Sequence, residues 1–347
     1  MPIRPPHRRS FLAAAFLVAG LHPIPARAQS QLEKSKITLA VDGEAALYHL
    51  PLTIADQLGY FKAEGLEVEI NGMVSGARAL QALPGSTADV FAGAFENTIN
   101  GQTKGQMLQS FVLQGRAPQI ALGVSTHNMP GYRMLTDLRG KKIGVAALGT
   151  PSHMVANVVL SQAGVAPGEV QFISIGSAGG ALWALRSGQI DAICNIDPVM
   201  GMLEKKSDIK IVSDTRTLKG ALDVFGGAMP AACVYAPLEF VRRFPNTVQA
   251  LTNAMVHALK WLQTAGPSDI VKMVPESYFL GDRAMYLAAF NKAREAISPD
   301  GLLPEEGPRT AWKALGSFDP LVKAARIDLG KTYTNDFARR AKERFRA

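Results

Sequence analysis

Cysteine is almost absent from this chain, which has only Cys194 and Cys233 among its 347 residues. A small fold held together by a framework of disulfides is therefore excluded, and at most one disulfide can form. Both cysteines lie in stretches that we predict to be buried strands, where a free thiol behaves as a small apolar side chain. The sequence leaves open whether they pair.

Long apolar runs are also missing, although 47% of the residues are hydrophobic. The most apolar run, residues 11–21, is about half of the ~20 residues that a membrane-spanning helix needs. It follows a basic stretch and precedes small residues around Ala28. Basic, apolar and small residues in this order predict a signal peptide over residues 1–28, cleaved near Ala28, that directs the chain to the periplasm.

Two export routes fit this segment. Arg8 and Arg9, followed by Ser10, Phe11 and Leu12, resemble the twin-arginine signal of proteins that are exported after folding. A Sec signal that happens to carry two arginines is the alternative. Cysteine does not follow the apolar run, so we expect no lipid anchor at this end.

Charge of one sign is not in large excess. The net charge is +8, and because four arginines lie in the expected signal peptide, the remaining 319 residues carry +4. This mild and evenly spread charge does not indicate a nucleic-acid partner, and it is compatible with an anionic solute. A chain of this length is sufficient for two domains, and we expect a monomer.

Motifs for catalysis and for metal or cofactor binding are missing as well. The sequence contains no GxSxG, GxxxxGK[ST], HExxH or CxxC pattern. The histidines of the exported part lie far apart, without the spacing of metal ligands: His49, His127, His153 and His257. We therefore expect no metal, no cofactor and no enzymatic activity.

Short β-rich runs alternate with helical patterns up to about residue 214, which predicts an α/β fold with mainly parallel sheets. The expected strands cover residues 37–41, 68–70, 89–92, 111–114, 143–146, 170–175, 192–195 and 209–213. One more strand is expected at residues 232–235, and an almost wholly helical C-terminal part follows it.

Two stretches rich in glycine, proline and polar residues, 125–133 and 225–230, interrupt this alternation. The strand expected at residues 232–235 has no sheet of its own unless it returns to the first one. We therefore expect lobe 1 to comprise residues 29–126 and 230–347, with residues 127–229 inserted as lobe 2. Two crossings between two lobes are typical of a hinge that closes on a solute.

Ligands of open α/β sheets bind outside the carboxyl ends of strands, so we searched the loops that follow the expected strands. The best candidate is residues 149–154, where Pro151 fits the first turn of a helix. Thr150 or Ser152 could bind a ligand oxygen there, beside the partial positive charge of a helix N-terminus. The alternative is that Thr150 only caps the helix.

Other loops supply further candidates. Tyr48 and Phe95 could form aromatic walls, and the polar candidates are Asp42, His49, Glu96, His153, Asn195 and Asp197. Phe95 could equally belong to the core, and Asp197 could only cap the helix that follows it. Arg216 could pair with an anionic solute, but we expect it to form a surface salt bridge.

Three ordered motifs resemble the nitrate/sulfonate/taurine solute-binding family, which also includes binding proteins for pyrimidine precursors of thiamine. They are LPLTIA with GYFKAEGLEV at residues 50–55 and 59–68, DLRGKKIGV at residues 137–145, and LRSGQIDA at residues 185–192. The similarity covers residues 36–237. Related pyrimidine synthases of fungal type carry a cysteine-rich motif that this sequence lacks.

The resemblance implies a two-lobed periplasmic-binding fold with two hinge crossings, and a membrane permease with a cytoplasmic ATPase as partners. It also implies ligand contacts from the loops at residues 42–49, 93–96, 149–153 and 195–197. We therefore expect an ABC-importer binding protein that captures a small organic anion, sulfonate-like or a carboxylate, by hinge closure. A pyrimidine or aromatic solute is the close alternative. A periplasmic enzyme with His49 or His153 as general base, and a sensor subunit, are further alternatives.

Overall fold

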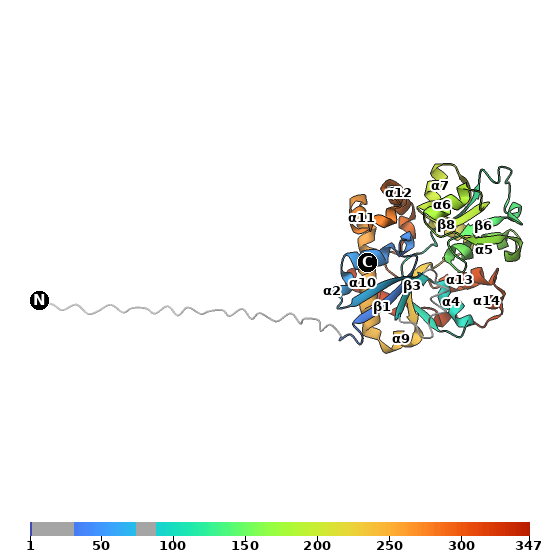
Figure 1. The fold of residues 1–347 in the computed structure, drawn as a ribbon. Coiled ribbons are helices and arrows are strands. Elements are labelled where there is room, and N and C mark those ends of the chain that lie inside the picture. Colours follow the sequence, from blue (N-terminus) through green and yellow to red (C-terminus); the bar gives the residue numbers. More distant parts are fainter. Residues whose placement is uncertain (2–30, 74–87) are drawn as a thin grey trace. The chain divides into compact units, whose positions relative to one another are not determined.

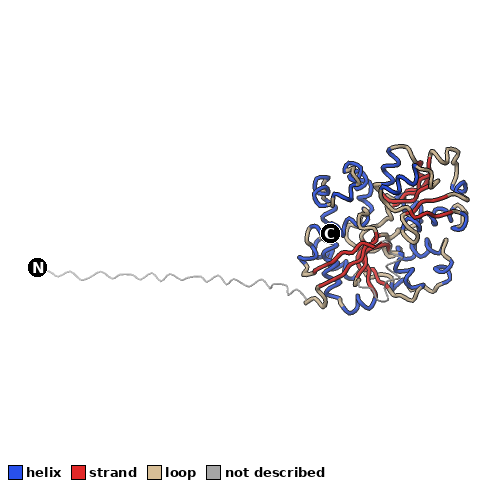
Figure 2. Tube along the Cα trace, viewed as in Figure 1, coloured by secondary structure: helices blue, strands red, loops and turns tan. Residues whose placement is uncertain are grey.

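The computed structural model describes residue 1, residues 31–73 and residues 88–347. Residues 32–347 form one compact unit. The signal peptide expected over residues 1–28 lies, apart from Met1, outside the described residues. Figure 2 shows the strands of the described part gathered into two groups, each with helices around it.

The first sheet has the strand order β2-β1-β3-β10-β4. Strand β1 pairs in parallel with β2 and β3, whereas β10 lies antiparallel between β3 and β4. The strand expected near residues 232–235 therefore does return to the first sheet. All residues of β3 are buried, as is typical of a strand covered on both faces. The bounds are β1 Lys36–Asp42, β2 Glu67–Met73, β3 Val90–Ala94, β4 Leu108–Leu113 and β10 Ala232–Pro237.

The second sheet has the strand order β7-β6-β8-β5-β9. Strand β6 is parallel to β7 and β8, and β5 is antiparallel to β8 and β9. Both sheets therefore combine parallel βαβ units with one antiparallel strand, which fits the expected α/β class. The bounds are β5 Ile120–Ser125, β6 Lys142–Val145, β7 Gln171–Ser174, β8 Ala192–Ile196 and β9 Ile209–Asp214.

Strand β5 differs from the sequence-based expectation. It was not among the expected strands, and it falls within residues assigned to lobe 1, yet it pairs with β8 and β9 of the second sheet. All of its residues are buried, so it lacks the alternation of polar and apolar residues that marks a half-exposed strand. The division into lobes stays a prediction, and this pairing favours a first crossing before Ile120 over one at residue 126.

Helices connect and cover the strands, and the chain after β10 is almost entirely helical, as expected (Figure 1). Up to β10 the helices are α1 Leu50–Gln57, α2 Tyr60–Ala63, α4 Glu96–Thr103, α5 Pro151–Gln162, α6 Gly179–Arg186, α7 Val199–Lys205 and α8 Leu218–Phe225. After β10 they are α9 Leu238–Arg243, α10 Pro245–Thr264, α11 Pro267–Met273, α12 Arg283–Ala293, α13 Gly307–Gly316, α14 Pro320–Ala324 and α15 Asp336–Phe345.

One apolar core extends from the first sheet to the second. It includes Phe91 and Leu113 of the first sheet, Leu122 and Val145 of the second, and Leu315 of α13. Helix α13 contacts α4 next to the first sheet and α5 and α8 next to the second. The C-terminal helices therefore pack against both sheets.

The two cysteines are far apart in this arrangement. Cys194 lies in β8 of the second sheet and Cys233 in β10 of the first, and both are buried free thiols. Burial raises the pKa of each thiol. Because the apolar surroundings disfavour the thiolate, neither cysteine is suited to nucleophilic chemistry.

Arg216 forms a buried network of ion pairs rather than the surface salt bridge that we expected. Its side chain is 1% exposed. Its guanidinium nitrogens lie 2.7 Å from Asp214, 2.6 Å from Glu204 and 3.2 Å from Asp197. Lys292 of α12 also lies 3.0 Å from Asp214. The network ties the turn after β8 and helix α7 to the end of β9.

Gly301 offers a test of packing at the junction of the C-terminal part and the first sheet. Its φ is +79°, and a β-carbon there would lie 2.8 Å from Cγ2 of Val112 and 3.0 Å from Cγ2 of Val256. We expect Gly301→Ala to lower the free energy of unfolding by about 1–2 kcal/mol through the left-handed backbone. Overpacking of the two valines adds about 1–3 kcal/mol. Urea titrations measure the sum.

Gly105→Ala is the matched control, because Gly105 has a φ of +74° and nothing within 4 Å of its added β-carbon. This variant should show the backbone cost alone. Equal losses of stability in the two variants would contradict the packing role of Gly301.

Candidate functional site

Two cavities lie where loops of the first sheet face loops of the second. The Glu96 pocket has room for about one water, at about 10 Å³, and is lined by Tyr48, Ala94, Glu96, Pro118, Pro151, Met154, Met229, Ala231 and Ala232. The Ser152 pocket measures about 150 Å³ and is lined by Asp42, Gly43, Tyr48, Ile120, Ala146, Thr150, Pro151, Ser152, Gly176, Ser177 and Ile196. Because the two pockets share Tyr48 and Pro151, we treat them as one cleft.

Two carboxylates define the side of the cleft that the first sheet forms. Asp42 is the last residue of β1, and Glu96 is the first residue of α4, directly after β3. They are 7% and 5% exposed. Gly93 makes room for the first of them, because a β-carbon there would lie 3.1 Å from Oδ2 of Asp42.

His49 holds Asp42 from behind. Its Nε2 lies 3.0 Å from Oδ1 of Asp42, and its Nδ1 lies 3.3 Å from Nε2 of Gln114. The Nε2 position can donate a proton to the Asp42 carboxylate, and the Gln114 amide lies beside Nδ1. His49 is fully buried, and both of its ring nitrogens are engaged. It therefore positions Asp42.

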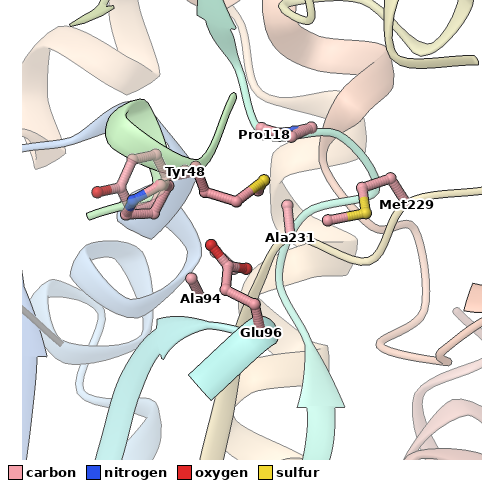
Figure 3. A pocket seen from close by; sticks show the side chains of 9 residues that line it. Tyr48, Ala94, Glu96, Pro118, Met229 and Ala231 are labelled. Atoms are coloured by element: carbon pink, nitrogen blue, oxygen red, sulfur yellow. The ribbon is translucent and has the colours of Figure 1, made fainter. Parts of the chain in front are cut away.

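Glu96 has an unusual protonation equilibrium. Burial raises the pKa of its carboxyl to about 7, its own backbone N–H opposes this, and the charge of Asp42 adds to it. Burial, with Asp42 and Glu96 nearby, likewise raises the pKa of the Tyr48 hydroxyl. Figure 3 shows the Glu96 carboxylate directed into the space between Tyr48 and Met229.

The lining of the cleft is acidic. Among the described residues that line the two pockets there is no lysine, arginine or histidine. The charged side chains are the two carboxylates, and the tyrosine and the two hydroxyl residues of α5 and its preceding loop add polar groups. Asp42 has His49 behind it, whereas Glu96 has no basic side chain beside it in this lining. A buried carboxylate of this kind favours a ligand that supplies hydrogen-bond donors or positive charge.

The second sheet contributes the loop between β6 and α5. Thr150 is the N-cap residue of α5, but its side chain makes no capping hydrogen bond. Its hydroxyl instead donates to the carbonyl of Ala147 at 2.7 Å and lies 3.0 Å from Oγ of Ser152. The Ser152 hydroxyl accepts from the N–H of Ala146 at 3.0 Å. The two hydroxyls thus stabilise the loop between β6 and α5 by hydrogen bonds within it, next to the uncapped start of α5.

The structure brings half of the sequence-predicted site residues together. Asp42, Tyr48, Glu96, Thr150 and Ser152 line the cleft. Their role in binding stays a prediction.

The other predicted residues are absent from the described lining of both pockets: His49, Phe95, His153, Asn195 and Asp197. Phe95 is a fully buried core residue. His153 packs edge-on against Phe172, its Nδ1 accepts from the N–H of Gly149, and burial lowers its pKa.

Asn195 and Asp197 contact other parts of the second sheet's loops. The Asn195 amide donates to the carbonyl of Gly176 at 2.8 Å and accepts from the N–H of Ile196 at 2.9 Å. It thereby positions two residues that line the Ser152 pocket. Asp197 accepts from the N–H of Gly201 and pairs with Arg216.

Sequence reasoning missed the lining that comes from the two segments between the sheets, residues 114–119 and 226–231. Pro118 belongs to the first segment, and Met229 and Ala231 belong to the second. The break predicted at residues 225–230 already contained Met229, so hinge segments themselves were a usable signal. Pro118 was not predicted to line the cleft because the first crossing between the lobes was expected after residue 125.

The described residues contain neither a membrane-spanning helix nor a cluster of metal ligands. No helix in residues 31–73 and 88–347 is long and apolar enough to cross a membrane. Within the same residues, no three His, Cys, Asp or Glu side chains lie close enough to hold a metal ion.

Known proteins resemble this chain in fold and sequence. A solved structure of a protein from Bordetella bronchiseptica RB50 is 53% identical, covers 91% of this chain and all of its own, and has a TM-score of 0.88. The periplasmic aliphatic sulphonate binding protein SsuA from Escherichia coli is 14% identical, with 86% and 97% of the two chains covered and a TM-score of 0.66. This second likeness shows the periplasmic-binding-protein fold.

A curated relative from Schizosaccharomyces pombe is 4-amino-5-hydroxymethyl-2-methylpyrimidine phosphate synthase. It is 24% identical over 234 residues, which cover 65% of this chain and 64% of that protein. The family described as NMT1/THI5 like matches residues 46–265, which include loops from both sheets of the cleft. This match extends over more than half of the sequence, and the chain therefore belongs to the NMT1/THI5-like family.

Proposed function

We propose that this protein is the solute-binding component of an ABC importer and captures a small molecule in the periplasm. The observation that carries the proposal is a cleft built from both sheets, with Glu96 and Asp42 on one side and the start of α5 on the other. A ligand that contacts both sides stabilises the closed arrangement of a hinged protein. A ligand that contacts a single side does not shift the equilibrium between the open and closed states. The periplasmic-binding fold and the expected signal peptide support the same function. A membrane permease, reading the closed form, and its ATPase would be the partners of a monomer.

The acidic lining supports a solute with an amine, an amidine or several N–H donors. Such a group would face Glu96, which has no basic side chain beside it in the described lining, and Asp42, whose Oδ1 lies 3.0 Å from Nε2 of His49. Tyr48 and Met154 would contact a flat or apolar body. Of the two solute classes expected from the sequence, this fits the pyrimidine or aromatic class better than the organic anion.

One feature of the cleft supports the binding of an organic anion. The start of α5 at Pro151 is uncapped by Thr150 and borders the Ser152 pocket. Helix N-termini attract anions, with about 0.3–1 kcal/mol for exposed groups. Two buried carboxylates in the same cleft oppose an anion with full charges, so we rank it second.

Catalysis on the same fold is the rival, and the pyrimidine phosphate synthase relative is its basis. A general base must reach the proton that it removes. His49 and His153 are absent from the described lining, and His49 has both ring nitrogens engaged. These contacts support binding without chemistry.

A thermal-shift screen tests the solute class. Aminopyrimidines and aromatic amines should raise the Tm, with about 2.7 kcal/mol of stabilisation at 100 times Kd. Sulfonates, carboxylates and nitrate should have little effect. We expect Glu96→Gln to weaken binding of a stabilising amine by about 10- to 100-fold, because a hydrogen bond to a charged group is lost.

Glu239→Gln is the control, because Glu239 also lies in the first turn of a helix but is exposed. It should leave the affinity unchanged. Stabilisation by anions alone would overturn the solute class, and conversion of a stabilising compound during the assay would overturn the binding function.

The raised pKa of Glu96 predicts a pH dependence. From about pH 4.5 to about pH 7 the folded protein keeps the Glu96 proton that the unfolded chain loses, so the free energy of unfolding falls. Above about pH 7 both states are ionised and the fall ends. A cationic solute holds Glu96 ionised, so its affinity should decrease as the pH drops below about 7.

Urea titrations of the wild type and Glu96→Gln at pH 5 and pH 8 measure this effect. Tyr48, Cys233 and Tyr235 lie near Glu96 in both proteins, and burial raises their pKa values above this pH range. From pH 5 to pH 8, the free energy of unfolding of the variant should therefore rise relative to that of the wild type. An identical difference at pH 5 and pH 8 would show that Glu96 does not titrate in this range.

Export can be tested on the full chain expressed in a bacterium. We expect the protein in the periplasmic fraction with Gln29 at its N-terminus, as measured by mass spectrometry. A double variant, Arg8→Lys with Arg9→Lys, should block export through the twin-arginine route and leave a Sec route open. A cytoplasmic protein that retains Met1 would contradict export by either route.

A further inference from the structure

A second hollow lies behind the segments that connect the sheets. This rear groove measures about 540 Å³ and is lined in part by Leu218 and Leu222 of α8, by Met229, and by Leu302 and Leu303 of the C-terminal part. Among the described residues, Met229 is the only one that lines both the Glu96 pocket and the rear groove. Its side chain is 1% exposed.

The two connecting segments form the rest of the wall. In the first segment, Pro118 lines the Glu96 pocket and Arg116 lines the rear groove. In the second, Ala231 lines the pocket, and Gly227 with Ala228 lines the groove. The connecting segments therefore contribute residues to both spaces, and Met229 is the described residue that the two linings share. Figure 3 shows its side chain at the Glu96 pocket.

The space on the far side suits an apolar chain. Leucines supply much of its lining, and Leu222 is 54% exposed, so the groove opens to solvent. Arg116, Asp300 and Glu306 add charged groups there. On the near side, the Glu96 pocket has room for about one water. Methionine is unbranched and flexible, so it can close such a gap without a rigid fit.

We propose that Met229 is a specificity-determining residue that limits the length of the solute. With Met229 in place, a solute whose donor group faces Glu96 must end at this side chain. With a short residue there, the cleft would continue into the rear groove and accept a solute with an apolar tail. The inference rests on the proposed function for the donor head group, and the position of the wall can be tested without any solute.

The first experiment determines crystal structures of the wild type and Met229→Ala under xenon pressure, since xenon binds in apolar cavities. We expect xenon in a continuous channel from the Glu96 pocket to the rear groove in the variant alone. Two separate hollows in the variant, because neighbouring side chains have closed the gap, would overturn the proposal. Met229→Val serves the same purpose if the alanine variant does not fold.

The second experiment compares the affinities of n-butylammonium and n-octylammonium by calorimetry. In the wild type the longer probe should bind no more tightly than the shorter one. In Met229→Ala the affinity for n-octylammonium should exceed that for n-butylammonium at least tenfold, since each buried methylene raises the affinity about fourfold. Met154→Ala removes the same atoms from another wall of the Glu96 pocket, away from the rear groove, and should give a smaller gain.

Equal gains in the two alanine variants would overturn the role of Met229 in length selection. Failure of both probes to bind wild type and variants would instead reject the cationic solute class of the proposed function. In that case the xenon structures still decide whether Met229 is the wall, so the two failures are distinguishable.

Discussion

The insertion of β10 between β3 and β4 is the pairing on which the rest of this structure depends. By returning to the first sheet, the chain closes its second passage between the sheets and brings residues 226–231 against residues 114–119. These two passages form one side of the cleft, and the loops after β1, β3 and β6 form the others. The long C-terminal run of helices then covers the first sheet and reaches the second through α13.

The electrostatic environment of the cleft depends on its two carboxylates and on the absence of basic side chains from its described lining. Asp42 has the imidazole of His49 behind it, with Nε2 3.0 Å from Oδ1 of the carboxylate. Glu96 has no basic neighbour in the described lining, so its charge is balanced by protonation instead. The strongly basic Arg216 is close to the end of β8 but is occupied by three carboxylates. Among the described residues, the charged side chains that line the cleft are therefore acidic, although the chain as a whole is basic.

Much of the architecture could be predicted from the sequence, because alternating strand and helix patterns depend on local periodicity. The α/β class, most strands and the return of the strand near Ala232 were predicted in this way. Strand β5 was not, although β3, which is buried along its whole length as well, was predicted. Half of the predicted site residues line the cleft because loops after parallel strands share one edge of a sheet. Phe95, His153 and Asp197 could not be excluded in advance, since the direction of a side chain depends on packing partners that are distant in sequence. The Asp42–His49–Gln114 contact, which joins β1 to the segment after β4, could not be predicted from the sequence either.

The continuous apolar core has a consequence for how the molecule folds. Phe91 and Leu113 share that core with Leu122 and Val145, and Leu315 of α13 belongs to it as well. Neither sheet can therefore lose its packing without exposing apolar surface on the other, which couples their unfolding into one cooperative transition. Because part of this core is supplied by α13, near the end of the chain, the second sheet can complete its packing during synthesis only after nearly the whole polypeptide has been made. A chain that crosses a membrane after folding has to finish this step beforehand, whereas a chain threaded unfolded finishes it on the far side.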